Sequence, residues 1–247
     1  MSSYYESPEA LFSLLIHHYG IPDQIYLIAH TQAFRFDESC VFTVQESLRE
    51  MELPRLSRAL ELGCAVGRST FELRRYFDEV IGIDYSQVLI ETALQMKLER
   101  ACSATWQPIG YAPRTCFVSL PAHLPVDHVV FQQEDACQLP KYIGSFDLVF
   151  MDKLLDRLYD PEKCLAQMSN LVKTGGYLVI ASPYQWREEF TPAAKWLGTP
   201  VKALARLVEI LTPDFVLQRQ FNVPYLLNTE FTWFSWGVSE ASVWRRL

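Results

Sequence analysis

Short apolar runs alternate with amphipathic segments from about residue 57 to residue 211. Runs that are apolar throughout are typical of strands buried on both faces of a parallel sheet, and segments with helical spacing are typical of crossover helices. The runs predict strands at 59–62, 80–83, 129–132, 146–151 and 177–181, and the segments between them predict helices at 69–77, 86–98, 161–172 and 200–211. This order predicts a doubly wound α/β fold.

Two longer stretches rich in Phe and Trp follow, at 215–226 and 231–244, with Asn228 between them. Their length and the turn-forming residue between them predict an antiparallel hairpin rather than another crossover. The expected fold is therefore a mostly parallel, seven-stranded sheet of the Rossmann-like kind with an antiparallel hairpin at its C-terminal end.

The whole chain, residues 1–247, is expected to form one domain. Helical spacing of apolar positions predicts that residues 1–56 form a helical cap, which precedes a catalytic core at 57–247. Residues 98–127 contain four prolines and are too long for an ordinary connection between a helix and a strand. We interpret this segment as an insertion, which is either part of a lid or a surface excursion without a catalytic role.

The composition is that of an ordinary globular protein, with 49% hydrophobic and 21% charged residues. The net charge of −7 argues against a nucleic acid partner, because such binding depends on Lys and Arg that neutralise phosphates. The N-terminus lacks the regions of a secretory signal and no apolar run is long enough to span a membrane, so we expect a cytoplasmic protein without a membrane partner. The six cysteines include no C-x-x-C pair and are interpreted as reduced thiols, and no metal site is expected because the histidines lack H-E-x-x-H spacing.

The strongest candidate for a binding site is segment 59–69, which runs from an apolar strand through a turn into a helix and contains Gly63 and Gly67. Glycines let the backbone turn tightly and approach a ligand closely. Asp84 ends the next strand, where its carboxylate can accept hydrogen bonds from both hydroxyls of a ribose. Two alternatives remain: the glycines serve only the turn, or Asp84 caps the helix that follows it.

The chemistry of the turn argues against a dinucleotide. The G-x-G-x-x-G pattern that binds a pyrophosphate is absent, because Ala65 takes the place of the middle glycine. Glu61 adds negative charge just before the turn, which disfavours a phosphate there. A cationic ligand that carries an amino group, such as a sulfonium amino acid, matches this turn better.

Further polar or glycine positions lie at the ends of the later strands. Asp135 follows the third strand, Asp152 ends the fourth, and the pair Gly175–Gly176 precedes the fifth. Asp135 by itself is explained equally well as the cap of a turn. The whole series resembles the seven-stranded S-adenosylmethionine-dependent methyltransferases, in which the paired glycines usually follow Pro, whereas this chain has Thr174.

This resemblance implies that S-adenosyl-L-methionine is the cofactor. In such enzymes the acidic residue at position 135 accepts a hydrogen bond from the adenine amino group, and the backbone N–H at position 136 reaches the adenine ring. The residues expected to bind the cofactor are Glu61, Gly63, Cys64, Ala65, Gly67, Asp84, Tyr85, Asp135, Ala136 and Met151.

Segments spread over nearly the whole chain carry a more specific pattern, at 4–7, 18–20, 63–69, 77–80, 82–84, 135–137, 154–158, 182–184, 189–192 and 236–241. They resemble the 4-mercaptohistidine N-methyltransferases of ovothiol biosynthesis, which occur alone or fused to a sulfoxide synthase. Asp152 departs from that pattern, in which Asn is commoner. The resemblance implies methylation of an imidazole ring nitrogen on a thiohistidine, with the upstream sulfoxide synthase or lyase as a possible partner.

Methylation of a ring nitrogen ends with the loss of a proton, so a proton acceptor is expected nearby. Asp152 is the leading candidate, followed by Tyr184 and His18. The substrate sulfur competes as a nucleophile, so the ring must be held in one orientation, which aromatic walls can do unless these side chains only fill the core. The expected substrate-binding residues are Tyr4, Tyr5 and Trp186 for the ring, and Arg35 or Arg187 for the carboxylate.

Two other functions remain open at this stage. Cofactor motifs do not encode the acceptor, so another small-molecule amine, carboxylate or thiol is an alternative substrate. A regulatory module that binds the cofactor without catalysis is an alternative of another class. Degeneration of the binding turn would indicate such a module, but Glu61, Gly63, Gly67, Asp84 and Asp135 are all present.

Overall fold

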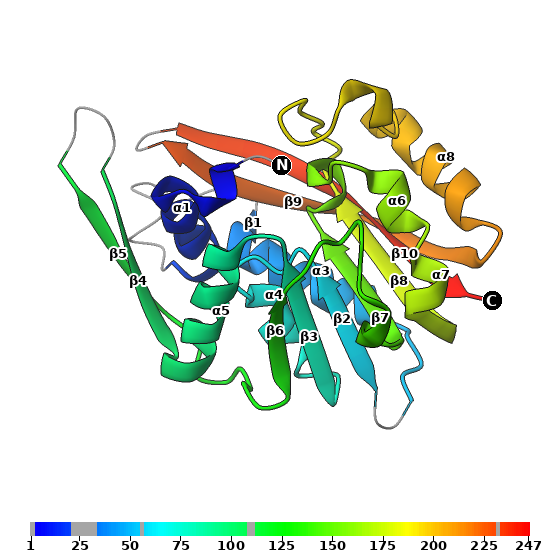
Figure 1. The fold of residues 1–247 in the computed structure, drawn as a ribbon, viewed down its shortest axis with the longest axis horizontal. Helices are drawn as coiled ribbons and strands as arrows, with labels where there is room; N and C mark the ends of the chain where they lie inside the picture. Colours follow the sequence, from blue (N-terminus) through cyan, green and yellow to red (C-terminus); the bar gives the residue numbers. More distant parts are fainter. Residues whose placement is uncertain (1–2, 21–33, 55–56, 108–111, 231–232) are drawn as a thin grey trace.

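The computed structural model describes residues 3–20, 34–54, 57–107, 112–230 and 233–247. Its main feature is an eight-stranded sheet with the strand order β1-β9-β10-β8-β7-β2-β3-β6 (Figure 1). The predicted seven-stranded sheet is confirmed, and the short strand β1 (Phe34–Arg35) adds one further strand at the edge, parallel to β9 (Phe215–Glu230).

Five neighbouring parallel strands form one side of this sheet, and each lies within a few residues of its predicted position. They are β2 (Arg58–Leu62), β3 (Glu79–Asp84), β6 (Val129–Gln133), β7 (Phe146–Asp152) and β8 (Val172–Ser182). Alternate residues of one strand face opposite layers: Leu60 and Leu62 pack toward the helices after β7, whereas Ala59 packs with α3 and α4. Burial on both faces explains why these strands are apolar throughout.

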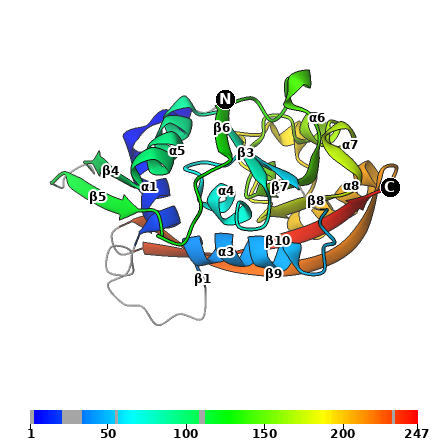
Figure 2. The same ribbon diagram turned by 90° about the horizontal axis from the view of Figure 1, so that it is seen from below.

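Helices cover both faces of the sheet (Figures 1 and 2). Helices α3 (Phe36–Leu48) and α4 (Arg68–Leu73) lie on one face, and α6 (Pro161–Leu165), α7 (Met168–Leu171) and α8 (Pro200–Leu211) lie on the other. Helix α5 (Gln87–Glu99) connects β3 toward β6. Three short 3₁₀ helices, η2 (Lys141–Ile143), η3 (Leu155–Arg157) and η4 (Ala193–Lys195), lie in the connections.

The single helix predicted at 161–172 is interrupted and forms α6 and α7. Gln167, which lies between them, uses its side chain to hold the loop before η2: it accepts from Leu139 N at 2.9 Å and donates to Ala136 O at 3.0 Å. The chain then enters β8 at Val172, five residues before the predicted start of that strand. A non-local contact therefore overrides the local helical pattern.

The C-terminal hairpin consists of β9 and β10 (Trp233–Arg246), and β10 lies between β8 and β9. The predicted turn at Asn228 was wrong, because β9 continues to Glu230 and Asn228 pairs with Phe234. The ladder of pairs on both sides of Asn228 outweighs the turn preference of this residue.

The N-terminal region contains η1 (Ser3–Glu6), α1 (Pro8–Tyr19) and α3 among its described residues. The predicted insertion contains a separate antiparallel sheet formed by β4 (Ala101–Trp106) and β5 (Arg114–Ser119), which projects beside α1 (Figure 1). Helix α1 packs against this hairpin, with the rings of Phe12 and Trp106 5.8 Å apart. The hairpin therefore supports the N-terminal helix rather than standing free.

Two remaining expectations concern the cysteines and membrane spans. All six cysteines are free thiols, and each one is buried. Within the described part of the chain, no helix combines the length and the apolar character that crossing a bilayer requires.

Candidate functional site

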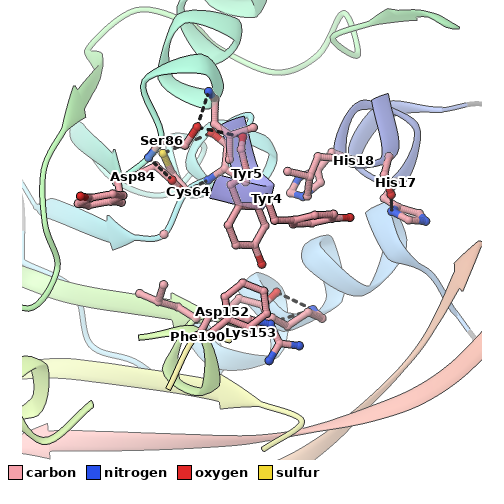
Figure 3. A pocket seen from close by; sticks show the side chains of 18 of the residues that line it. Tyr4, Tyr5, His17, His18, Cys64, Asp84, Ser86, Asp152, Lys153 and Phe190 are labelled. Carbon is pink, nitrogen blue, oxygen red and sulfur yellow. Dashed lines mark hydrogen bonds and ion pairs between the residues drawn. The ribbon is translucent and has the colours of Figure 1, made fainter. Parts of the chain in front are cut away.

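A cavity of roughly 790 Å³ opens at the carboxyl ends of the parallel strands. Residues at the ends of β2, β3, β6 and β7 line it on one side, and η1 and α1 cover it on the other (Figure 3). Ligands of open α/β sheets bind at this edge. Of the residues predicted to bind the cofactor, eight line this cavity: Glu61, Gly63, Cys64, Ala65, Asp84, Tyr85, Asp135 and Ala136.

The turn after β2 is held against β3. The backbone N–H groups of Gly63 and Cys64 both donate to Ile83 O, at 2.8 and 2.9 Å. Gly63 has a φ of +75°, and a Cβ at this position would lie 2.7 Å from Leu154 Cδ1. Both the backbone conformation and the close neighbour therefore require glycine at position 63.

Gly67 and Met151 serve the packing rather than the cavity wall. Gly67 is the N-cap of α4 with a φ of +89°, and a Cβ there would lie 2.7 Å from Phe131 Cζ. Met151 is fully buried in the core. Neither residue lines the cavity, so their predicted contact with the cofactor is not supported by their position.

Asp84 is fixed at the end of β3 by two backbone donors. Its Oδ2 accepts from Ala65 N at 2.9 Å, and its Oδ1 accepts from Ser86 N at 3.0 Å. The N-cap of α5 is Ser86, whose hydroxyl accepts from Leu89 N, so capping by Asp84 is not needed. Burial raises the pKa of Asp84, and these backbone donors oppose the increase.

Glu61 is buried at the end of β2, where Thr70 Oγ1 donates a hydrogen bond to it. Burial raises the pKa of Glu61 to about 8, and the hydrogen bond from Thr70 lowers it only in part. A cation placed beside Glu61 would favour its ionised form. This is the environment expected for the amino end of a cationic ligand.

Asp135 lies at the end of β6 and is also held in place. Its Oδ1 accepts from Cys137 N at 2.8 Å, and its Oδ2 accepts from the Tyr159 hydroxyl at 3.0 Å. The first of these contacts is the turn-capping interaction that the sequence left as an alternative. Because Asp135 also lines the cavity, the two readings are compatible.

An ion pair forms the wall beyond the end of β7. Lys153 Nζ donates to both carboxylate oxygens of Asp152 at 2.9 Å, and the two side chains are 12% and 5% exposed. The ammonium also lies 4.7 Å from the ring centroid of Phe36 and 5.2 Å from that of Tyr225. Burial lowers the pKa of Lys153, but the charge and hydrogen bonds of Asp152, together with the nearby Cys40 and Tyr225, outweigh burial and raise it. The ammonium of Lys153 therefore keeps its proton.

His18 lies in the same part of the cavity, at the end of α1 (Figure 3). Its ring is buried 5.0 Å from the ring of Phe36, and its Nδ1 has no hydrogen-bond partner among the described residues. Burial lowers the pKa of His18 well below its ordinary value of 6.5, and the nearby His17, Lys153 and Arg68 lower it further. His18 is therefore neutral.

Tyr4 and Tyr5 of η1 form the cover of the cavity. The ring of Tyr5 lies 5.8 Å from the ring of Phe190 and meets Tyr4 edge to face at 5.3 Å. The hydroxyl of Ser86 donates to Tyr5 O at 3.2 Å, which ties the cover to the start of α5. Burial raises the pKa of Tyr5 to about 12, so its hydroxyl remains protonated at neutral pH.

Other predicted residues lie elsewhere. Tyr184 is buried in the core, and the indole of Trp186 donates to Gly198 O and stacks on Trp196, so neither lines the cavity. Arg187 lines it, but its side chain is 62% exposed and lies 3.4 Å from Glu189. The side chain of Arg35 lies outside the described part of the chain.

Several lining residues were not predicted as site residues. Among them are Phe36, Lys153, Arg157, Phe190 and Tyr225. Arg157 and Phe190 fall in segments of the narrower family pattern, which was the only signal that could have identified them. Phe36 and Tyr225 come from elements far apart in the sequence, and only the fold brings their rings to Lys153.

The residues present fit S-adenosylmethionine. Asp84 presents a fixed carboxylate for ribose hydroxyls, Asp135 and Ala136 lie where an adenine ring is expected, and Glu61 offers a carboxylate to the amino end. The glycine turn between them brings the backbone to the cavity without a side chain.

Comparison with known proteins also indicates a methyltransferase domain. Residues 60–180 match the family model of a methyltransferase domain. The chain is 30% identical over 100 residues to the trans-aconitate 2-methyltransferase of Variovorax paradoxus (strain S110), a match that covers 38% of this chain and 39% of that protein. It is 28% identical over 158 residues to the O-methyltransferase cnsE of Penicillium expansum, which covers 64% of this chain and 46% of that protein. Overall, the chain spans 39 to 51% of the length of the curated relatives it matches.

Solved structures with the same fold include two informative examples. The N-methyltransferase NodS from Bradyrhizobium japonicum WM9, in complex with S-adenosyl-L-homocysteine, superposes with a TM-score of 0.55 at 18% identity, covering 96% of this chain and 98% of that one. The [4+2]-cyclase SpnF superposes with a TM-score of 0.58 at 17% identity, covering 90% of this chain and 73% of that one. These likenesses show the fold, which serves more than one kind of chemistry.

Proposed function

Because the chain carries a class I S-adenosylmethionine-dependent methyltransferase domain, we propose that it methylates an imidazole ring nitrogen of 4-mercaptohistidine (5-thiohistidine) to give ovothiol. The observation that carries the proposal is the composition of the wall beyond the cofactor residues. There, the ammonium of Lys153, which is paired with Asp152, lies beside the rings of Phe36 and Tyr225. A planar, polar ring that has a proton to lose fits this combination. The family pattern spread along the chain supports the same acceptor.

S-adenosylmethionine, when bound, supplies an electrophilic methyl group. Asp152 then acts as the acceptor of the proton that the ring loses, and Lys153 holds its carboxylate in one orientation. His18 is neutral and lines the same cavity, where its ring can contact the acceptor. Positioning of this kind can lower the barrier by several kcal/mol.

The aromatic cover has two tasks in this mechanism. Tyr5 and Phe190 exclude water from the cavity, which strengthens the electrostatic interactions inside it. They also restrict the orientation of a flat ring, so that the nitrogen rather than the ring sulfur faces the methyl donor. Tyr184 and Trp186 take no part, because both pack away from the cavity.

A small-molecule carboxylate or hydroxyl acceptor is the second candidate. It is favoured by the names of the two curated relatives, a trans-aconitate 2-methyltransferase and an O-methyltransferase. The regulatory alternative is disfavoured by the intact cofactor residues Glu61, Gly63 and Asp84.

Incubation with methyl-labelled S-adenosylmethionine and a panel of acceptors tests the proposal. The panel contains 4-mercaptohistidine, histidine, trans-aconitate and a simple thiol, and mass spectrometry locates the label. We expect labelled ovothiol with the methyl group on the ring. Methylation of another compound but not of 4-mercaptohistidine would reject the proposal, and absence of cofactor binding in calorimetry would favour the regulatory module.

The thiohistidine must be supplied by an enzyme that attaches sulfur to the histidine ring. We propose that the upstream sulfoxide synthase or lyase delivers it and that both act in the cytoplasm. Direct transfer of the substrate is tested in two ways: whether the two proteins co-purify, and whether free thiohistidine added to the solution is methylated as readily as thiohistidine made by the upstream enzyme.

A further inference from the structure

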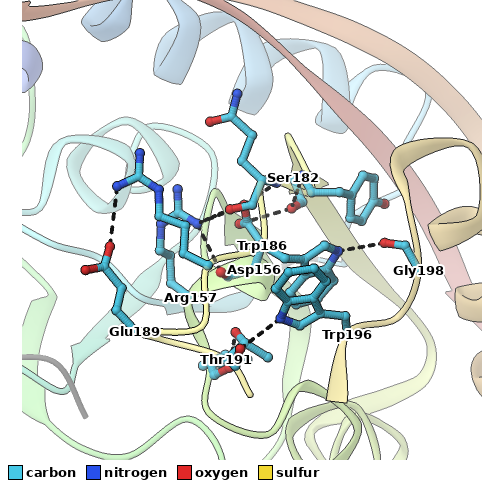
Figure 4. A network of polar contacts seen from close by, with 12 residues as sticks. Asp156, Arg157, Ser182, Trp186, Glu189, Thr191, Trp196 and Gly198 are labelled. Atoms are coloured by element: carbon cyan, nitrogen blue, oxygen red, sulfur yellow. Dashed lines mark hydrogen bonds and ion pairs between the residues drawn. The ribbon is translucent and has the colours of Figure 1, made fainter. Parts of the chain in front are cut away.

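Arg157 lies at the end of η3, close after the strand that carries Asp152, and lines the cavity. Its side chain is only 19% exposed. The residue before it, Asp156, is fully buried. Figure 4 shows this buried carboxylate and the neighbouring guanidinium together with their polar contacts.

Asp156 is the centre of a network that spans η3 and the end of β8. Its Oδ1 accepts from Ser182 Oγ at 3.2 Å. Its Oδ2 accepts from Gln185 N at 2.8 Å and from Arg157 Nη1 at 3.0 Å. The hydrogen bonds of this carboxylate therefore fix the end of β8, the segment that follows it and the guanidinium of Arg157.

The guanidinium of Arg157 is held from one side only. Its Nη1 also donates to Asp156 O at 3.0 Å and to Gln185 O at 2.9 Å, and its plane lies 5.2 Å from the ring centroid of Phe190. Its Nε and Nη2 have no hydrogen-bond acceptor within the ranges that the structure describes. The Nε–Nη2 edge of an arginine is a fork that matches the two oxygens of a carboxylate.

The rest of the cavity wall makes such a fork necessary for an anionic ligand. Carboxylate side chains outnumber Lys and Arg side chains by eight to four among the lining residues. Lys153 is occupied by Asp152, and Arg187 is mostly exposed and lies next to Glu189. Arg114 of β5 already takes part in another interaction. An acceptor with a negative group would be repelled by this wall unless a fixed cation met it.

We propose that Arg157 binds the carboxylate of the methyl acceptor through its Nε–Nη2 edge, and that Asp156 is the positioning residue that aims it. The acceptor class is then a small molecule with a carboxylate. This inference rests on the proposed function in one respect, that a small-molecule acceptor occupies this cavity. It reassigns to Arg157 the role that the sequence suggested for Arg35 or Arg187.

Calorimetry on the S-adenosylhomocysteine-loaded protein tests the role of Arg157 without any turnover. The probes are acids matched with a neutral or decarboxylated partner: histidine with histamine, tyrosine with tyramine, and tricarballylate with its triamide. We expect at least one acid to bind about ten- to hundred-fold more tightly than its partner. Arg157→Gln removes this preference and Arg157→Lys reduces it, because Lys keeps the charge but lacks the fork.

Arg206→Gln is the matched control. Arg206 also pairs with carboxylates, Glu162 and Glu209, but lies on α8 outside the cavity, so the acid preference should be unchanged. A preference that survives in Arg157→Gln, or that is lost equally in Arg206→Gln, overturns the inference. So does the absence of any acid preference in the wild-type protein.

The role of Asp156 needs a separate readout. Asp156→Asn is expected to raise KM for the acid acceptor about ten-fold and to leave kcat within a factor of two, because a displaced Arg157 weakens binding rather than chemistry. A purely structural role would instead lower the amount of folded enzyme and leave KM unchanged. That outcome removes Asp156 from the inference and leaves Arg157 to its own test.

The two proposals fail in different ways. In one outcome, 4-mercaptohistidine is not methylated, but the wild-type protein prefers another acid over its partner compound and Arg157→Gln does not. The thiohistidine assignment is then rejected and the carboxylate site is supported. If 4-mercaptohistidine is methylated and the acid preference survives in Arg157→Gln, the reverse holds.

Discussion

Lys153 Nζ donates to both carboxylate oxygens of Asp152 at 2.9 Å, and these two side chains are only 12% and 5% exposed. The two residues are neighbours in the chain, and Lys153 takes a φ of +58° to make this contact. A residue that is not glycine adopts such a backbone conformation only when its surroundings stabilise it. The strained backbone therefore belongs to the geometry of the site.

Asp152→Asn is expected to lower kcat for the acceptor by about 100-fold or more, because a positioned proton acceptor contributes about 10²- to 10⁴-fold. Initial rates with S-adenosylmethionine over a range of pH check this. Asp127→Asn, which removes an exposed carboxylate paired with Arg74, is the control. An unchanged rate and pH profile would exclude Asp152 as the proton acceptor and leave His18 as the next candidate.

Lys153→Met is expected to destabilise the fold by about 3 kcal/mol, because it leaves the charge of Asp152 buried without a partner. The double variant with Asp152→Asn should recover part of that loss, since neither charge remains. Urea unfolding of the wild type, both single variants and the double variant gives the coupling free energy. Strictly additive losses would mean that the ion pair contributes nothing to stability.

The protonation of Glu61 predicts a pH dependence of stability. Its folded-state pKa of about 8 lies above its ordinary value of 4.5, so between these values the folded protein binds more protons than the unfolded chain. The free energy of unfolding must therefore fall as the pH rises through this window, by at most about 1.4 kcal/mol per pH unit from this group. The contribution is complete below the lower value and lost above the upper one.

Glu61→Gln should flatten this slope in urea unfolding of the cofactor-free protein. Glu91→Gln, at an exposed position of α5, should keep the wild-type slope. Equal slopes in all three proteins would show that Glu61 is ionised in the folded state at neutral pH. A cationic ligand beside Glu61 should also release protons on binding, which calorimetry in buffers of different ionisation enthalpy detects.

Gly63→Ala and Gly175→Ala separate backbone strain from a clash in the cofactor turn. Both glycines have a positive φ, of +75° and +79°, but a Cβ at Gly63 meets Leu154 Cδ1 at 2.7 Å, whereas nothing lies within 4 Å of one at Gly175. Each variant should lose about 1 kcal/mol to strain. Only Gly63→Ala should also weaken the binding of S-adenosylhomocysteine, by about ten-fold or more. Equal affinities in calorimetry would mean that the turn tolerates a side chain.

The central strands and the cofactor residues were predictable because their signals are local. Strands buried on both faces leave uninterrupted apolar runs, and the residue that ends each run must lie at the carboxyl edge of the sheet. Glu61, Asp84, Asp135 and Asp152 were identified in this way, and all four line the cavity. Their roles in binding and catalysis stay predictions.

The acceptor side was predicted less well because the fold assembles it from distant segments. Pro183, Gln185 and Arg187 line the cavity, whereas Tyr184 and Trp186 between them face the core. The backbone of this segment is irregular, with a φ of +50° at Tyr184, so no periodic pattern in the sequence indicated which residues faced the ligand. Tyr184 and Trp186 were predicted as site residues from the chemistry of their side chains, but in the fold both pack with the core.

Both the N-terminal helix α1 and the cavity depend on the β4–β5 hairpin, which is an insertion. Trp106 and Arg114 of the hairpin line the cavity, and the apolar face of α1 packs on the hairpin. Shortening residues 101–119 to an ordinary connection would leave the large sheet with its strand order intact, yet it would expose α1 and remove part of the cavity wall. An engineer who trims this protein to a minimal scaffold would therefore keep the sheet and lose the shape of its binding cavity.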